Sequence, residues 1–287
     1  MRDLSDIRVI KELMAAHGVG FSKSLGQNFL TDAEVCPLMA EYGGARPGAG
    51  VLEIGPGIGI LTAELARRAD KVVAVELDNK LLPVLAQTLE EFDNTEIVHV
   101  DILRLDLPAL LRERFGELPV SVCANLPYYI TSPVLMLLLE SRLPFETITV
   151  MVQKEAAQRL CAAVGDRLAG AVSVAVNYYA RAEVLFEVPR TAFVPPPKVD
   201  SCVIRLEIRP EPPVSVADEA GFFRMVKAAF GQRRKTAANG ISAGMGIDKA
   251  LIAAAIESAG FGATVRAESL TMDELARLYN EIHARLP

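Results

Sequence analysis

The sequence predicts an α/β protein with a doubly wound parallel sheet, followed by a small helical domain. Three observations lead to this fold class. Short β-branched segments alternate with segments of helical periodicity through roughly the first two thirds of the chain. These short segments are almost continuously apolar, as strands buried on both faces of a parallel sheet are. After about residue 210 the pattern is helical to the end. Right-handed strand–helix–strand units are the usual way to build such a sheet.

Five segments are predicted to be the strands of the parallel sheet. They are GVLEIG (50–55), KVVAVE (71–76), EIVHVD (96–101), VSVCAN (120–125) and TITVMVQ (147–153). The helices expected between them cover residues 61–69, 79–92 and 132–142. Ser132 is expected to cap the last of these helices, with Pro133 at its first position.

Two later β-branched segments, 182–188 and 201–208, have no helical pattern between them. We expect them to form an antiparallel pair at the edge of the sheet. The proline-rich stretch 209–218 is then predicted to be a linker. The predicted domains are therefore residues 1–210, containing the sheet, and residues 211–287, containing only helices.

The predicted helical domain carries two helix-end signals. Gly260 follows an alanine-rich helical segment and is expected to end it. Thr271 and Glu274 have the spacing of a capping box, which predicts the start of the last helix.

Composition and charge exclude several classes of protein. The first 180 residues hold 16 Lys and Arg against 23 Asp and Glu, whereas the remainder holds 14 against 13. The net charge of −6 therefore gives no global attraction for nucleic acid, and such a partner must be held by local patches. The four cysteines are far apart without a CxxC pair, and the three histidines are scattered, so we expect no metal site and a reducing cytoplasm. We expect no membrane segment and no targeting peptide.

A glycine-rich turn and two acidic residues predict a cofactor site. Gly55, Gly57 and Gly59 lie in EIGPGIG (53–59), between the first predicted strand and the first helix. Glycines there allow a tight turn and a close approach of the backbone to a ligand. Glu76 ends the second predicted strand and can accept hydrogen bonds from both hydroxyls of a ribose. Asp101 ends the third and can accept one from an adenine amine.

Two cofactors compete for this site. A dinucleotide needs a diphosphate cradle, usually G-x-G-x-x-G or A, but here the spacing is G-x-G-x-G and Ile60 occupies the last small position. S-adenosylmethionine has no phosphate and needs a glycine-rich approach together with two acids. The combination favours S-adenosylmethionine. A tight turn with solvated strand ends is the alternative without a ligand.

The tetrapeptide Asn125-Leu126-Pro127-Tyr128 follows the fourth predicted strand and points to methyl transfer. The Asn125 side-chain oxygen and the Leu126 carbonyl can accept both N–H groups of an exocyclic adenine amine. This favours a pyramidal nitrogen and stabilises its developing positive charge. Pro127 restricts the backbone, and Tyr128 offers a ring on which a base can stack. A base inside a helix cannot reach such a pocket, so the target must be flipped or lie in a loop. The alternative is a polar strand end with a buried tyrosine.

These residues carry a resemblance that extends over nearly the whole chain. The sequence resembles the ribosomal RNA adenine N6,N6-dimethyltransferase family, and most of all its bacterial small-subunit members. The motifs that carry the resemblance are KSLGQNFLTD (23–32), VLEIGPGIGILT (51–62), VVAVELD (72–78), DILRLD (101–106), NLPYYITSP (125–133), MVQKEAAQRL (151–160), FVPPPKVDS (193–201) and FGQRRKT (230–236).

The resemblance implies a Rossmann-like methyltransferase domain and a C-terminal domain that contacts RNA or the ribosome. It implies that S-adenosylmethionine is bound, without a metal, by six residues: Asn28, Leu30, Gly55, Glu76, Asp101 and Asn125. It also implies that the segment 125–128 holds the target adenine. The implied reaction dimethylates N6 of two adjacent adenosines in a hairpin loop near the 3′ end of 16S rRNA. The implied partner is the assembling small subunit, and the enzyme is expected to be a cytoplasmic monomer.

Other assignments stay open at this stage. A 23S rRNA methyltransferase of the macrolide-resistance type shares the motifs, although Leu126 and the helical tail favour the small-subunit members. A non-catalytic assembly module and a dehydrogenase are the remaining alternatives. The basic cluster Arg233, Arg234 and Lys235 is either a phosphate-binding patch or a solvated helix face. The segment 23–28 is a candidate cover for the cofactor.

Overall fold

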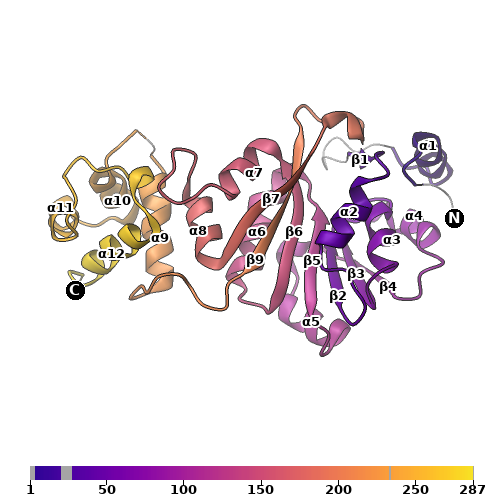
Figure 1. The fold of residues 1–287 in the computed structure, drawn as a ribbon, viewed down its shortest axis with the longest axis horizontal. Coiled ribbons are helices and arrows are strands. Elements are labelled where there is room, and N and C mark those ends of the chain that lie inside the picture. The colour runs from indigo at the N-terminus through magenta and orange to yellow at the C-terminus, as the bar shows by residue number, and fades with distance from the viewer. Residues whose placement is uncertain (1–3, 21–27, 233, 287) are drawn as a thin grey trace. The chain divides into compact units, whose positions relative to one another are not determined.

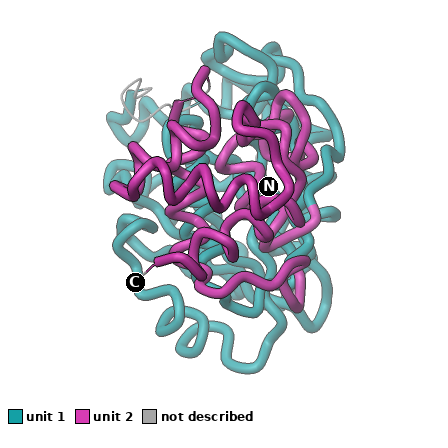
Figure 2. Tube along the Cα trace, turned by 90° about the vertical axis from the view of Figure 1, so that its left-hand side faces the viewer, with its two compact units in different colours: residues 1–157, 182–208 teal, residues 158–181, 209–287 magenta. Residues whose placement is uncertain are grey.

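The computed structural model describes residues 4–20, 28–232 and 234–286 of the chain (Figure 1). The chain divides into two compact units, coloured separately in Figure 2. The first contains residues 1–157 and 182–208, and the second contains 158–181 and 209–287. The last residue of the first unit is Ile208, and the second unit continues from Arg209. The sequence analysis placed this boundary at residue 210. Residues 158–181 were expected in the first domain. They instead belong to the second unit, with the C-terminal helices, and are called the excursion below.

The first unit is built on a seven-stranded sheet in the order β4-β3-β2-β5-β6-β9-β7. Strands β2 to β6 pair in parallel, which confirms the doubly wound α/β prediction. β9 pairs antiparallel with β6, and β7 lies beside β9 at the sheet edge. The strand bounds are β2 Gly50–Ile54, β3 Lys71–Glu76, β4 Thr95–His99, β5 Val120–Asn125, β6 Phe145–Gln153, β7 Ala180–Val188 and β9 Ser201–Ile208.

The helices follow the predicted order with shifted ends. Their bounds are α1 Ile7–Ala16, α2 Val35–Tyr42, α3 Ile60–Ala66, α4 Leu82–Thr88, α5 Leu107–Phe115, α6 Thr131–Glu140, α7 Lys154–Leu160, α8 Ala171–Tyr179, α9 Glu219–Phe230, α10 Ala237–Met245, α11 Lys249–Ser258 and α12 Met272–His283. Within the described part of the chain, no helix is both long enough and apolar enough to cross a membrane.

The capping signals had mixed outcomes. The prediction that Ser132 caps α6 was wrong, because a 3₁₀ turn ending at Ile130 runs directly into the helix and Ile130 takes the cap position. The capping box at the start of α12 is confirmed: Thr271 Oγ1 accepts from the Glu274 N–H, and a Glu274 carboxylate oxygen accepts from the Thr271 N–H. Gly260 follows the end of α11 with a φ of +83°, as a helix-ending glycine does.

The core of the first unit lies on both faces of the sheet. Val51 and Leu52 are neighbours on β2 whose side chains point to opposite faces, and both are fully buried. Val51 packs in one cluster with residues of α2 and α3, among them Met39 and Leu65. Burying an aliphatic side chain of this size contributes about 1.5–3 kcal/mol. The central strands are thus held from both sides, which fixes the position of their ends.

A second, two-stranded sheet joins distant parts of the sequence. β1 (Phe29–Leu30) pairs antiparallel with β8 (Phe193–Val194), with Leu30 opposite Phe193. The Thr31 N–H donates to the Ala192 carbonyl at 2.8 Å and continues the pairing. The segment that begins at Asn28 is therefore anchored to the loop before β9.

The excursion 158–181 is tied to the C-terminal helices by two tyrosines of α8. The hydroxyl of Tyr178 donates to one carboxylate oxygen of Glu219 at 3.1 Å, and that of Tyr179 to the other at 2.8 Å. Both rings also contact Phe223 of α9. This cluster explains why the excursion belongs to the second unit.

We expect Glu219→Ala to destabilise the second unit by about 2–4 kcal/mol, because the variant lacks the charged acceptor of two hydrogen bonds. Urea unfolding followed by circular dichroism measures the change. The matched control is Glu257→Ala, at an exposed position of α11, which should stay within about 0.5 kcal/mol of wild type. Equal unfolding curves for the two variants would contradict the anchoring role of Glu219.

Candidate active site

The glycine-rich turn after β2 has the backbone geometry that only glycine adopts readily. Gly55, Gly57 and Gly59 have φ angles of +72°, +62° and +91°. Gly59 takes the cap position of α3, and a Cβ there would lie 3.0 Å from the Thr88 hydroxyl. A side chain at Gly59 is therefore disfavoured both by the backbone angle and by this close contact.

Glu76 lies at the end of β3, next to this turn. It is buried, and its carboxylate accepts from the Asp78 N–H at 2.7 Å and, more weakly, from the Gly57 N–H at 3.4 Å. Burial raises the pKa of Glu76, and these backbone donors oppose the shift. The same two hydrogen bonds fix the side chain, so that the carboxylate is oriented before any ligand arrives.

Asp101 was predicted to end the third strand of the sheet, but it lies outside that strand. β4 ends at His99, so Asp101 follows the strand by two residues and does not end it. It caps the 3₁₀ turn Ile102–Arg104, where its side chain accepts from the Leu103 N–H at 3.0 Å. β3 itself ends at Glu76, the residue paired with His99, so the pairing stops before Asp101.

The segment 125–128 continues from the end of β5. Asn125 is the last residue of the strand and lies opposite Met151 of β6. Leu126 is buried, and Pro127 has φ −55° and ψ 129°, so the chain leaves the sheet in an extended shape. No described residue hydrogen-bonds the side-chain amide of Asn125. Its donors and acceptor are therefore available to a ligand.

The side chain of Tyr128 is fixed by a hydrogen bond to a residue of β9. Its hydroxyl shares a 2.8 Å hydrogen bond with the hydroxyl of Ser201, a fully buried residue at the start of β9. Burial raises the pKa of Tyr128, and the bond to Ser201 opposes this shift. The ring of Tyr129 is instead 56% exposed. One of the two consecutive rings is fixed and the other is presented to solvent.

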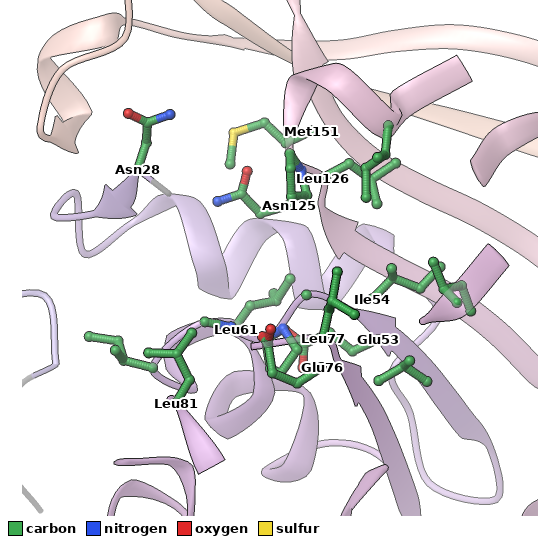
Figure 3. Close-up of a pocket in the computed structure, with 18 of the residues that line it drawn as sticks. Asn28, Glu53, Ile54, Leu61, Glu76, Leu77, Leu81, Asn125, Leu126 and Met151 are labelled. Carbon is green, nitrogen blue, oxygen red and sulfur yellow. Dashed lines mark hydrogen bonds between the residues drawn. The ribbon is translucent and has the colours of Figure 1, made fainter. Parts of the chain in front are cut away.

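One cavity of about 310 Å³ collects these groups. The residues that the resemblance implies for the cofactor and the target base line it: Asn28, Leu30, Gly55, Glu76, Asp101, Asn125, Leu126, Pro127 and Tyr128. Of the other two glycines of the turn, Gly57 lines the cavity and Gly59 is not among its lining residues. Figure 3 shows Asn125 and Glu76 bordering the same space, with Glu53 beside Glu76. Phe193 also lines the cavity, although its side chain is buried. Residues 23–27 of the predicted cover lie outside the described residues.

Glu53 is a cavity residue that the sequence analysis did not single out. It is 1% exposed, and its Oε2 atom has no hydrogen-bond partner among the described residues. Burial raises the pKa of Glu53 to about 8; the nearby Thr62 hydroxyl opposes the shift, and the charge of Glu76 adds to it. The signal was present in the sequence, since Glu53 is the single charged residue in the apolar strand GVLEI.

The parallel strand order, the glycine turn after β2 and the acid that ends β3 define the class of this protein as a Rossmann-like α/β methyltransferase. The sequence then matches a family described as "Ribosomal RNA adenine dimethylase" over residues 19–284. The chain belongs to this family.

Curated relatives match the chain over almost its full length. A "Ribosomal RNA small subunit methyltransferase A" from Geobacillus thermodenitrificans is 47% identical, covering 98% of this chain and 97% of the relative. A protein of the same name from Shouchella clausii is 45% identical over 99% of this chain and 97% of the relative.

Two solved structures are also similar. The "23S rRNA methyltransferase ErmE" is 30% identical with a TM-score of 0.67, covering 89% of this chain and all of that one. A dimethyladenosine transferase from Plasmodium falciparum has a TM-score of 0.72 over 89% of this chain and 98% of that one, at 22% identity. The second likeness supports the fold alone.

We expect the burial of Glu53 to make stability depend on pH. The folded chain keeps the Glu53 proton up to about pH 8, whereas a glutamate in the unfolded chain loses it near pH 4.5. The contribution of Glu53 to stability is thus fully present below about pH 4.5 and is lost as pH rises towards about 8. The loss is at most about 1.4 kcal/mol per pH unit.

Urea unfolding of wild type and Glu53→Gln across this pH range measures the effect. The difference in the free energy of unfolding should move in favour of Glu53→Gln as pH rises. Glu257→Gln, at the exposed position on α11, is the control and should track wild type throughout. Parallel stability curves for wild type and Glu53→Gln would contradict the raised pKa.

Proposed function

We propose that this chain is an S-adenosylmethionine-dependent enzyme that dimethylates N6 of adenosine in the ribosomal RNA of the small subunit. The observation that carries the proposal is that Asn125 to Tyr128 line the same cavity as the glycine turn and the two acids Glu76 and Asp101. A cofactor site and a site for a base thus meet at one place. The names of the relatives and the family agree with this arrangement.

The cavity fits S-adenosylmethionine better than a dinucleotide. The carboxylate of Glu76 lies next to the glycine turn and accepts from the Gly57 N–H at 3.4 Å, whereas the nearby Glu53 stays protonated up to about pH 8. A diphosphate would meet like charge there, whereas the cofactor with a sulfonium meets opposite charge. In the proposal, Glu76 accepts hydrogen bonds from the ribose hydroxyls and Asp101 accepts one from the adenine of the cofactor. Asn28, Leu30 and Asn125 complete its surroundings.

The cofactor, when bound, supplies a methyl group already activated by the positive sulfur. The chain has to align the acceptor nitrogen with it. The Asn125 side-chain oxygen and the Leu126 carbonyl accept the two N–H groups of the adenine amine, and Pro127 keeps these two acceptors in position. The Tyr128 ring, fixed through Ser201, stacks on the base at about 1–3 kcal/mol. This arrangement stabilises the charge that forms on nitrogen and needs no general base.

The finer substrate is also part of the proposal. We infer two adjacent adenosines in the hairpin loop near the 3′ end of 16S rRNA, on an assembling small subunit, as the target. The two curated relatives named for the small subunit are 45–47% identical to this chain, compared with 30% for the 23S enzyme. We further propose that the chain acts as a cytoplasmic monomer and that residues 211–287 contact RNA or the ribosome.

Methyl transfer to purified subunits tests the function. Small subunits that lack the modification are incubated with the enzyme and radiolabelled S-adenosylmethionine, with large-subunit RNA as the control, and nucleosides are then analysed. Dimethyladenosine in small-subunit RNA alone is the expected result. Label in large-subunit RNA would favour the 23S alternative. Tight binding without label in either RNA would favour a non-catalytic assembly module.

Two variants separate cofactor binding from methyl transfer. Asn125→Ala should lower the transfer rate about 10²–10³-fold, because it removes one acceptor for the adenine amine, with little change in cofactor affinity. Glu76→Ala should weaken cofactor binding about tenfold or more, because it removes the ribose acceptor. Calorimetry and single-turnover methyl transfer measure the two effects. Wild-type turnover by Asn125→Ala would contradict the acceptor pair.

The basic cluster provides a test of RNA binding. Arg234 and Lys235 are exposed in the turn between α9 and α10, not on a helix face, and Arg233 lies outside the described residues. Neutralising Arg234 and Lys235 to Gln should reduce the salt dependence of RNA binding. The log–log slope should fall by about 0.7 for each phosphate group that the variant no longer neutralises.

The matched control for this cluster is a double variant of two other exposed cations, Lys11→Gln with Arg112→Gln. Its slope should equal that of wild type in filter-binding titrations against salt. If the Arg234 and Lys235 variant also keeps the wild-type slope, the turn does not bind phosphates.

A further inference from the structure

Tyr129 is an exposed aromatic residue of the cavity to which the proposed reaction gives no role. Its side chain lines the cavity although more than half of it is exposed to solvent. Within the described part of the chain, no other ring packs against Tyr129 and no group hydrogen-bonds its hydroxyl. A large ring of this kind beside a binding cavity is a surface that a ligand can cover.

The backbone fixes the direction in which this ring points. Tyr128 and Tyr129 are consecutive in a 3₁₀ turn, and the Ile130 N–H closes the turn by donating to the Pro127 carbonyl at 3.1 Å. A 3₁₀ turn has three residues per turn, so consecutive side chains point about 120° apart. The Tyr128 hydroxyl is bonded to Ser201, and the Tyr129 ring therefore points elsewhere. Because the two rings diverge, they do not enclose one base, and Tyr129 is available to a second.

A second turn of similar character packs on the same helix. Helix α6 contacts both the turn that contains Tyr129 and the 3₁₀ turn Ile102–Arg104. Leu103 of that turn is also exposed and lines the cavity, and the side chain of Arg104 is 85% exposed. The contact between Arg104 and Asp101 is 3.7 Å long and open to solvent, so it is weak. Apolar side chains with a cation beside them suit a nucleotide, because its base has apolar faces and its phosphate is negative.

We propose that Tyr129 stacks on the base next to the target adenosine in the RNA strand. The inference rests on the proposed function, because it takes RNA as the substrate and Tyr128 as the ring for the target base. A target base must leave its stack to reach the cavity, so the neighbouring base then loses a stacking partner. The ring of Tyr129 replaces that partner and holds the strand beside the cavity. Since two adjacent adenosines are the proposed target, the stacked neighbour is itself an adenosine.

Stacking of the neighbouring base is a binding interaction that the ground state and the transition state share, so its loss raises KM and leaves kcat unchanged. Tyr129→Ala should raise the KM for small subunits that lack the modification about tenfold, with the affinity for S-adenosylmethionine unchanged. Tyr129→Phe keeps the ring and should match wild type. Val184→Ala is the matched control, because Val184 is an exposed apolar residue of β7 that does not line the cavity. Methyl transfer at varied subunit concentration and calorimetry of cofactor binding measure these effects.

Removing the neighbouring base from the RNA tests the contact itself. The proposed loop is near the 3′ end of 16S rRNA, so a synthetic 3′ segment with an abasic site beside one remaining adenosine can be ligated before the subunits are reconstituted. Wild type should have an about tenfold higher KM for the abasic subunits than for intact ones. Tyr129→Ala has already lost the stacking contact and should have the same KM for both.

The outcomes separate this inference from the proposed function. An equal rise in KM on abasic subunits for wild type and Tyr129→Ala would overturn the inference, as would a wild-type KM of Tyr129→Ala on intact subunits. Weaker binding of S-adenosylmethionine by Tyr129→Ala would assign the ring to the cofactor and overturn it as well. If wild type methylates intact and abasic subunits equally, the inference fails and the proposed function stands. If wild type does not methylate intact subunits, the proposed function itself is refuted.

Discussion

The parallel pairing of β2 with β3 and β5 is the constraint on which the rest of the site depends. Parallel register brings the carboxyl ends of these strands to one edge, where Ile54 lies opposite Val75, and Asn125 lies opposite Met151 on the next strand. A shift by one residue would turn the Glu76 and Asn125 side chains to other faces of the sheet. The apolar packing on both faces of the sheet prevents such a shift. The contacts that stabilise the core therefore also fix the geometry of the site.

The parallel strand pairing alone does not form the cavity. Two interactions between distant parts of the chain complete it. The short β1–β8 sheet places Asn28 and Leu30 on the cavity, and the hydrogen bond from Ser201 of β9 fixes the Tyr128 ring. Both interactions join residues more than seventy positions apart in the sequence. A change in the loop before β9 should thus alter the positions of Asn28, Leu30 and Tyr128 together.

Electrostatics give the cavity its chemical preference. Acids gather around a space with no cation among its described lining residues, and burial raises the pKa of both Glu53 and Glu76. Glu76 is stabilised by backbone donors, whereas Glu53 keeps an unpartnered oxygen. A cation in this cavity would meet carboxyl groups and no like charge among the described lining residues.

The sequence by itself determined the class of fold, the parallel strands and the glycine turn, because burial periodicity and glycine turns are local signals. The tetrapeptide after β5 and the acid ending β3 could be predicted for the same reason. Only the tertiary structure decided that residues 158–181 join the C-terminal helices, since that depends on Tyr178 and Tyr179 meeting Glu219 from a distant helix. The tertiary structure also decided that Glu53 is buried and that its Oε2 atom has no hydrogen-bond partner among the described residues. An acid in an apolar strand is visible in the sequence, but whether it finds a partner depends on which side chains the folded sheet brings around it.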